Sequence, residues 1–224
     1  MTAPASDERT HERTPYLLGE MPVGSAMQTT DERIVHAPVA LIFDVARKVE
    51  LWPAYLSHYR RVRFRDRASD GGGLVEMSAW RPVGSLPGGW PTWWLSEMAV
   101  DSVRPAIRFR HVGGITREME VEWSFHSRAD GTLVRIVHAW NGPHWPLVGV
   151  FAATSVIGPH FIRAIAQRTL RGLGRVAERE GGKQEADSRN QQLLDASPSS
   201  PLKREPMSPP ELDPRFHGND GPPG

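Results

Sequence analysis

The chain has 224 residues, enough for one ordinary domain with tails, and its formal net charge is +1. This balance argues for neither nucleic acid nor an anionic membrane as a partner, and the absence of cysteine excludes disulfides, thiolate metal sites and a cysteine nucleophile. The polar first 19 residues lack the features of a signal peptide. The longest apolar run, Pro146–Pro159, is too short for a transmembrane segment, so we expect a cytoplasmic protein.

Composition divides the chain into three segments. Residues 1–28 are polar with scattered proline and glycine, which is typical of a flexible leader. Residues 181–224 carry eight of the 20 prolines and few apolar side chains. Such a segment cannot bury enough apolar surface to offset the entropy lost on ordering, so we expect a disordered tail. The folded domain is therefore predicted to span residues 29–180.

Within this domain a first strand is predicted over Thr30–His36. Pro38 then opens a short helix, because its missing N–H is not needed in the first turn. Further strands follow, separated by glycine-containing turns: Tyr59–Arg67, Leu74–Arg81, Thr92–Val100, Ala106–Val112, Arg117–Ser127 and Thr132–Trp140. From Pro159 to about Glu180 the apolar spacing becomes that of one long amphipathic helix. This order of strands and helices predicts an α+β fold in which the long helix covers one face of an antiparallel sheet.

Side chains alternate between the two faces of a strand, so each predicted strand has one apolar face, which we expect to turn toward the helix. All eight tryptophans lie between Trp52 and Trp145, and several fall on these faces. Ser96, His111 and His138 are the polar residues on the same apolar faces. Sparse polar groups among aromatic walls are typical of a small-molecule site.

The sequence resembles the START-like (SRPBCC, Bet v 1-like) superfamily, closest to the polyketide cyclase/dehydrase (aromatase/cyclase) group. The segments that carry the resemblance run in register: Val35–Ala46, Trp52–Tyr59, Trp94–Met98, Phe109–Val112 and Val121–Phe125. The resemblance implies a helix-grip fold, in which a curved antiparallel sheet of about six or seven strands wraps around the long C-terminal helix. It also implies an internal hydrophobic cavity between the sheet and that helix.

The resemblance and the strand faces together give the candidate site residues. Those predicted to assist chemistry are Tyr59, Ser96, His111 and His138. Those predicted to bind ligand are Trp52, Trp80, Arg81, Trp94, Met98, Phe109, Trp123 and Trp140. Met98 stands where the cyclases carry an arginine, which removes a charge and a fork of donors from the pocket.

Each candidate also has a purely structural interpretation. The two histidines are alternatively core residues bonded to the backbone, and Ser96 is alternatively a plain strand serine. Trp123 and Trp140 are either core or cavity wall, and Tyr59 is either at the cavity mouth or at a half-buried edge. The segment Gly142–Gly158 is either a lid or a short buried helix.

Other motifs predict little chemistry. The nine histidines show no metal-binding spacing, and Gly71-Gly72-Gly73 lacks the lysine and hydroxyl of a phosphate loop, so no metal or cofactor is expected. Four arginines alternate along one predicted strand: Arg61, Arg63, Arg65 and Arg67. They form either a solvated face or a docking patch for an acidic acyl carrier protein.

Three hypotheses about function follow. The first is a cyclase/dehydrase acting on a polyketide or aromatic precursor, with orientation of the chain supplying much of the rate. The second is a non-catalytic carrier of a quinone or lipid, which Met98 favours because it leaves an adaptable apolar group. The third is a protein-binding domain whose cavity is filled by tryptophan.

Overall fold

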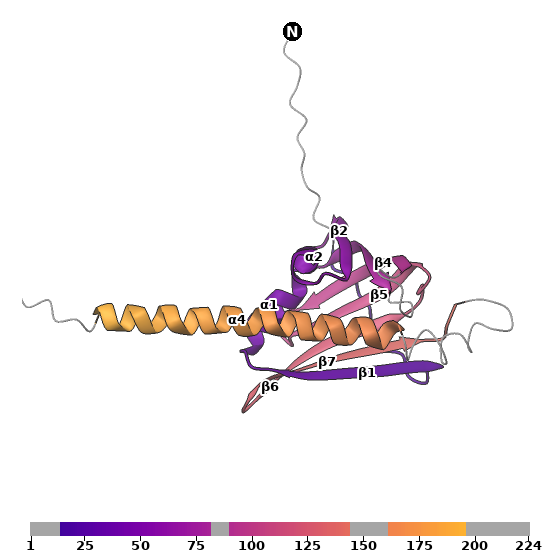
Figure 1. The fold of residues 1–224 in the computed structure, drawn as a ribbon. Coiled ribbons are helices and arrows are strands. Elements are labelled where there is room, and N and C mark those ends of the chain that lie inside the picture. Colours follow the sequence, from indigo (N-terminus) through magenta and orange to yellow (C-terminus); the bar gives the residue numbers. More distant parts are fainter. Residues whose placement is uncertain (1–13, 82–89, 144–160, 196–224) are drawn as a thin grey trace, which may run out of the picture. The chain divides into compact units, whose positions relative to one another are not determined.

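The computed structural model describes residues 14–81, 90–143 and 161–195 (Figure 1). The strands are β1 Met27–Val35, β2 Tyr59–Arg67, β3 Gly73–Arg81, β4 Trp90–Asp101, β5 Ala106–Gly114, β6 Glu120–Arg128 and β7 Gly131–Trp140. The helices are α1 Val39–Arg47, the 3₁₀ turn η1 Val49–Leu51, α2 Trp52–Tyr55 and α4 Arg163–Asp195.

The seven strands form one sheet in the order β1-β7-β6-β5-β4-β3-β2, with every neighbouring pair antiparallel. Hairpins join consecutive strands from β2 to β7, and β1 crosses over to pair with β7. The predicted strands are all present. β6 begins three residues later than predicted, because residues 117–119 form a tight loop in which Glu118 has a φ of 69°. β1 begins earlier than predicted, at Met27.

Helix α4 packs against the inner face of the sheet and against the segment after α2, and a glycine of α4 permits the close approach at each place. A Cβ at Gly172 would collide with the side chain of Leu56, and one at Gly174 would lie 3.2 Å from Val35 Cγ2. The core between the helix and the sheet includes the fully buried Leu173 and Ile136. The α+β helix-grip fold predicted from the sequence is therefore confirmed.

The ends of the predicted domain differ from expectation. Helix α4 continues to Asp195, so residues 181–195, predicted to be disordered, are helical; residues 196–224 lie outside the described part of the chain. In the segment predicted as a leader, Leu18 is buried, and the Leu18 and Gly19 carbonyls accept hydrogen bonds from Arg110 and Arg108 on β5. Across residues 14–81, 90–143 and 161–195, no helix is long and apolar enough to cross a bilayer.

Ion pairs cover the outer face of the sheet. Arg63 and Arg65 on β2 both bond Glu76 on β3, and Arg67 bonds Glu50. Three of the four arginines of the predicted face thus pair with two glutamates, which is typical of a solvated surface.

Candidate functional site

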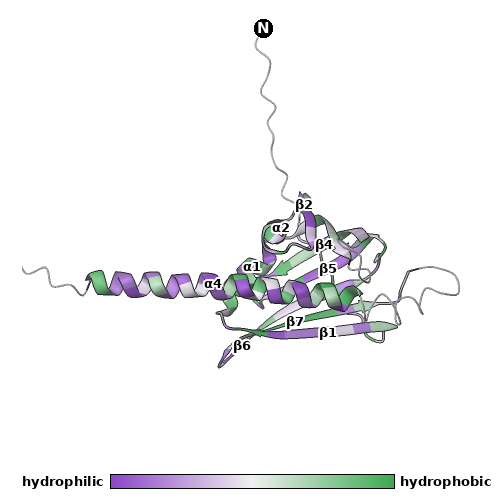
Figure 2. Ribbon diagram, in the orientation of Figure 1, coloured by the Kyte–Doolittle hydropathy of each residue, from purple (hydrophilic) through white to green (hydrophobic). Residues whose placement is uncertain are grey.

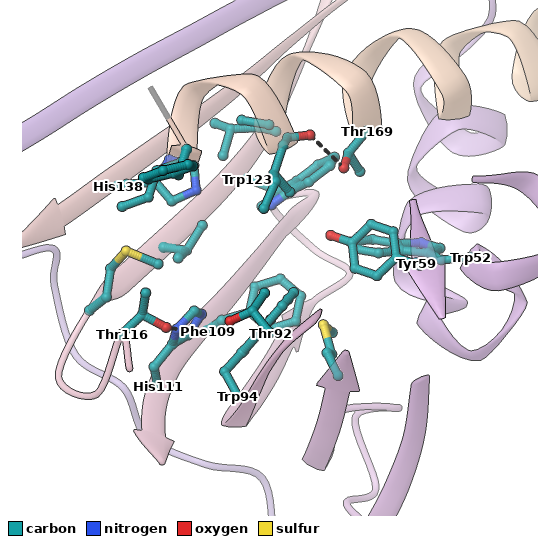
Figure 3. A pocket seen from close by; sticks show the side chains of 18 residues that line it. Trp52, Tyr59, Thr92, Trp94, Phe109, His111, Thr116, Trp123, His138 and Thr169 are labelled. Carbon is teal, nitrogen blue, oxygen red and sulfur yellow. Dashed lines mark hydrogen bonds between the residues drawn. The ribbon is translucent and has the colours of Figure 1, made fainter. Parts of the chain in front are cut away.

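A cavity lies between the inner face of the sheet and the first turns of α4 (Figure 3). Its volume is about 100 Å³, below the 300–1,000 Å³ typical of ligand pockets. Residues from every strand but β1, from α2 and from α4 line it: Trp52, Tyr59, Met77, Thr92, Trp94, Phe109, His111, Thr116, Met119, Val121, Trp123, Ile136, His138, Phe161, Ile162, Ile165, Ala166 and Thr169. No charged side chain belongs to this wall as far as the structure describes it, so the cavity favours neutral ligands.

Aromatic rings build much of the wall. The Trp52 ring centroid lies 5.6 Å from that of Trp123 and 5.1 Å from that of Tyr59. On the other side, Trp94 stacks on His111 at 5.9 Å between centroids. Such ring pairs are rigid and offer flat apolar surfaces, whereas the thioethers of Met77 and Met119 adapt in shape.

Two histidines face this apolar space from strands on either side of β6. The Nδ1 atom of His111 lies 2.7 Å from Thr116 Oγ1, and Nδ1 of His138 lies 3.3 Å from Thr29 Oγ1. These bonds fix the rings and leave Nε2 of each without a hydrogen-bond partner among the described residues. Burial, with a smaller contribution from nearby His138, lowers the pKa of His111 to about 3, and burial lowers the pKa of His138 to about 4. Both imidazoles are therefore neutral near pH 7.

A second polar group lies across the cavity from the histidines. In Figure 3 the Tyr59 hydroxyl points into the cavity near Thr169 of α4. Burial raises the pKa of the Tyr59 phenol, and its hydrogen bond with Thr169 partly offsets that rise. The Thr169 hydroxyl donates to the Ile165 carbonyl at 2.9 Å and lies 3.1 Å from His58 Nε2. The phenol is thus a neutral hydrogen-bonding group at any moderate pH.

The structure brings together seven of the twelve predicted site residues at this cavity: Trp52, Tyr59, Trp94, Phe109, His111, Trp123 and His138. It adds residues that the sequence analysis did not select. Thr92 shares the face of Trp94, and Thr169 belongs to the apolar stripe of α4, so strand and helix periodicity could have indicated both. Thr116 lies in the β5–β6 loop, where no periodic signal exists.

Four predicted residues lie elsewhere. Ser96 and Met98 are fully buried in the core on the inner face, but neither lines the cavity. Trp140 is also core, and its Nε1 donates to the Arg117 carbonyl at 2.9 Å. Trp80 alternates outward on β3, where the Arg60 guanidinium lies 4.4 Å from its ring centroid.

The remaining predicted parts of the site fall outside the described side chains. Arg81 ends β3, but its side chain is not among those described. Residues 144–158 of the predicted lid lie outside the described part of the chain. No cluster of three or more potential metal ligands occurs among the described residues.

Replacing Ser96 with alanine is expected to stabilise the protein by about 1 kcal/mol, because the buried Ser96 Oγ has no hydrogen-bond partner among the described residues. Denaturant unfolding of Ser96→Ala would measure the gain. The matched control is Thr132→Val, which removes a buried hydroxyl that does donate, to the Ala37 carbonyl at 2.7 Å. That variant is expected to lose about 1 kcal/mol. Equal losses in both variants would contradict the assignment of Ser96 as an unsatisfied group.

Comparison with known proteins supports the architecture. A model of the family described as polyketide cyclase/dehydrase and lipid transport matches residues 35–155, more than half of the chain. A Streptomyces halstedii protein named as a candidate polyketide cyclase is 26% identical over 111 residues, which cover 49% of this chain and 97% of that protein.

Solved structures share the fold at low sequence identity. An aromatase/cyclase from Streptomyces sp. R1128 is 16% identical with a TM-score of 0.54, covering 68% of this chain and 94% of that one. A START superfamily protein from Mycobacterium smegmatis is 14% identical with a TM-score of 0.50, and the match covers 70% of this chain and 97% of that one. These likenesses show that the chain shares the fold of a START superfamily protein, and the family match shows that it belongs to the polyketide cyclase/dehydrase and lipid transport family.

Proposed function

We propose that the chain binds a neutral, oxygen-bearing polyketide or aromatic ligand in the cavity and promotes its cyclisation and dehydration. The observation that carries this proposal is the pair of buried neutral imidazoles, His111 and His138, each held at Nδ1 by a threonine hydroxyl at the wall of an apolar cavity. Tyr59 supplies a hydrogen-bonding phenol on the opposite side.

The proposed reaction needs only proton transfer. Nε2 of one imidazole accepts a proton from the carbon between two ligand carbonyls, giving an enol or enolate. That carbon forms a bond to a ketone carbon held against it, and the ketone oxygen takes up a proton to become a hydroxyl. Removal of a second carbon-bound proton then expels this hydroxyl as water, so the balance is the loss of one water without an oxidant or reductant.

The low histidine pKa values suit part of this cycle. An imidazolium with a pKa of about 4 is far more acidic than an ordinary histidine side chain, so it returns its proton readily to the departing hydroxyl. The Tyr59 phenol, with its raised pKa, stays protonated and donates to a ketone oxygen once its O–H turns away from Thr169. Most of the acceleration in this proposal comes from the aromatic walls, which hold the two reacting carbons in contact.

A second candidate is a carrier of a quinone or lipid without catalysis. It is favoured by the absence of charged side chains from the described wall and by Met98, which stands in the core where the resemblance would place an arginine. An acyl carrier protein as the donor of the ligand stays a prediction under the first proposal.

The two candidates can be separated with 2-tetralone, a neutral bicyclic ketone. We expect it to quench the tryptophan fluorescence of the cavity wall and to exchange its α-hydrogens for deuterium faster with protein than without, as followed by NMR. Whichever of His111→Gln and His138→Gln removes the base should slow the exchange at least tenfold, because a positioned base contributes that much or more. Their binding of 2-tetralone, measured by quenching, should change little.

The control is His126→Gln, which alters an exposed histidine on β6 and should leave exchange unchanged. Binding without accelerated exchange would refute the catalytic proposal and leave the carrier. Naphthalene-2-carboxylate, an anion of similar shape, should bind at least tenfold more weakly than 2-tetralone, because the described wall offers it no cation. Equal binding of the two would refute the neutral cavity.

A further inference from the structure

The exposed face of α4 carries a row of arginines that have no ion-pair partner among the described residues. Spaced by three or four residues, they project from one side of the helix and are all exposed: Arg168, Arg171, Arg175 and Arg179. None forms an ion pair with another described residue, whereas the arginines of the outer sheet face are bonded to glutamates. Figure 2 shows hydrophilic bands recurring along this helix.

This arrangement is unfavourable for the isolated helix. Like charges four residues apart repel, and Arg171, Arg175 and Arg179 form two such pairs. The nearby acidic side chains do not relieve the repulsion. Glu178 accepts a hydrogen bond from the His36 backbone N–H at 3.2 Å, and Glu180 pairs with Lys183. The near-zero net charge of the chain therefore conceals a local positive surface.

An exposed aromatic side chain lies beside this row. Tyr55 of α2 lines a surface groove together with Gly172, Arg175, Val176, Glu178 and Arg179. Tyr55 is 39% exposed, and Leu51, one turn earlier, is 45% exposed. Their neighbour Trp52 is turned into the core, so exposure of the other two is not a general property of this segment. Arginines beside an exposed tyrosine, with an exposed leucine nearby in the chain, are typical of surfaces that lie on a lipid headgroup layer.

We propose that Leu51, Tyr55 and the four arginines of α4 form a docking surface for an anionic lipid bilayer. The arginines lie over lipid phosphates and carboxylates, and the two apolar side chains enter the headgroup region. A bilayer fits better than an acidic protein because the guanidinium groups have no fixed partner geometry and the adjacent side chains are apolar. This surface lies on the outside of α4 and does not depend on what the cavity holds.

The test is sedimentation of the full chain with vesicles of phosphatidylcholine containing about 30% phosphatidylserine. The protein should bind these vesicles, lose binding as salt is raised, and ignore vesicles of phosphatidylcholine alone. The triple variant Arg171→Gln/Arg175→Gln/Arg179→Gln should bind about 100-fold more weakly, since each basic residue near an anionic surface contributes about fivefold. Tyr55→Ser should weaken binding without reducing its dependence on salt.

A control with the same change in charge uses exposed arginines away from α4, two in loops between strands and one at the end of β6: Arg104→Gln/Arg117→Gln/Arg128→Gln. This triple variant should retain binding to within a few-fold. Circular dichroism establishes that both triple variants remain folded. If the two triple variants weakened vesicle binding equally, the binding would depend on the net charge of the protein and not on the surface of α4, and the proposal would be overturned. So would failure of the parent protein to bind the anionic vesicles at low salt.

Discussion

The protein is expected to lose several kcal/mol of unfolding free energy as the pH falls from about 6.5 to about 4. In the folded state burial lowers the pKa of His138 to about 4 and that of His111 to about 3. Burial and the nearby Arg168 guanidinium lower the pKa of His58 to about 4. In the unfolded chain a histidine titrates near 6.5. Between these values the unfolded state binds more protons, so stability rises with pH through this window and is fully present above it.

The size of the effect follows from the shift. His138 alone contributes about 3 kcal/mol, because each pKa unit corresponds to about 1.4 kcal/mol. The carboxylates whose pKa values are lowered, such as Asp44 and Glu76, cost stability in the same direction only from about pH 5 downward, so the histidine contribution is measured above pH 5. Urea unfolding at pH 7.0, 6.0 and 5.0 should therefore show a steady fall in the transition midpoint.

A substitution at His138 tests whether the pH dependence of the unfolding free energy comes from the cavity. His138→Gln should flatten the fall in unfolding free energy between about pH 6.5 and 4.5, because it removes one proton that the unfolded state binds preferentially. His126→Gln, at an exposed position, should leave the slope as it is. A slope that is the same in all three proteins would show that His138 is not held neutral by burial.

The fold was largely predictable because its strands alternate. Along β4 the inward set Trp94, Ser96 and Met98 and the outward Trp93 are where the alternation predicts them, with Trp93 55% exposed. The change of period after Pro159 likewise identified the helix that covers the sheet. Its C-terminal end was predicted poorly, because residues 181–195 lack an apolar stripe yet continue the helix.

The cavity was harder to predict because alternation gives the face of a side chain but not its position along the strand. On β4 the cavity is lined by Thr92 and Trp94, while Ser96 and Met98 lie further along and are sealed in the core. The residues of α4 that line the cavity come from its first turns, and their position along β4 depends on tertiary packing, which alternation does not encode. Trp80 was predicted wrongly for a simpler reason, since it alternates with the inward Met77 and Ala79 and therefore faces outward.

Removing the Trp123 side chain is expected to destabilise the protein by about 3–5 kcal/mol, the usual cost of truncating a buried large aromatic residue. Trp123 is 4% exposed, packs on Trp52 and lines the cavity, so Trp123→Ala enlarges a space that already exists. The surrounding rings are held by the sheet and α4 and cannot collapse fully into the new volume. Denaturant unfolding measures the loss.

Indole should restore part of the stability of Trp123→Ala, because it supplies the deleted ring system to an apolar void of matching shape. The restored free energy should grow with the logarithm of indole concentration once it exceeds the dissociation constant, as expected for a ligand that binds only the folded state. Trp93→Ala provides the control, since the Trp93 side chain is exposed on the outer face and its removal leaves no void. That variant should lose little stability and gain none from indole. Rescue of both variants, or of neither, would mean that Trp123 does not bound a ligand-accessible cavity, and the proposed site on the inner face would fail with it.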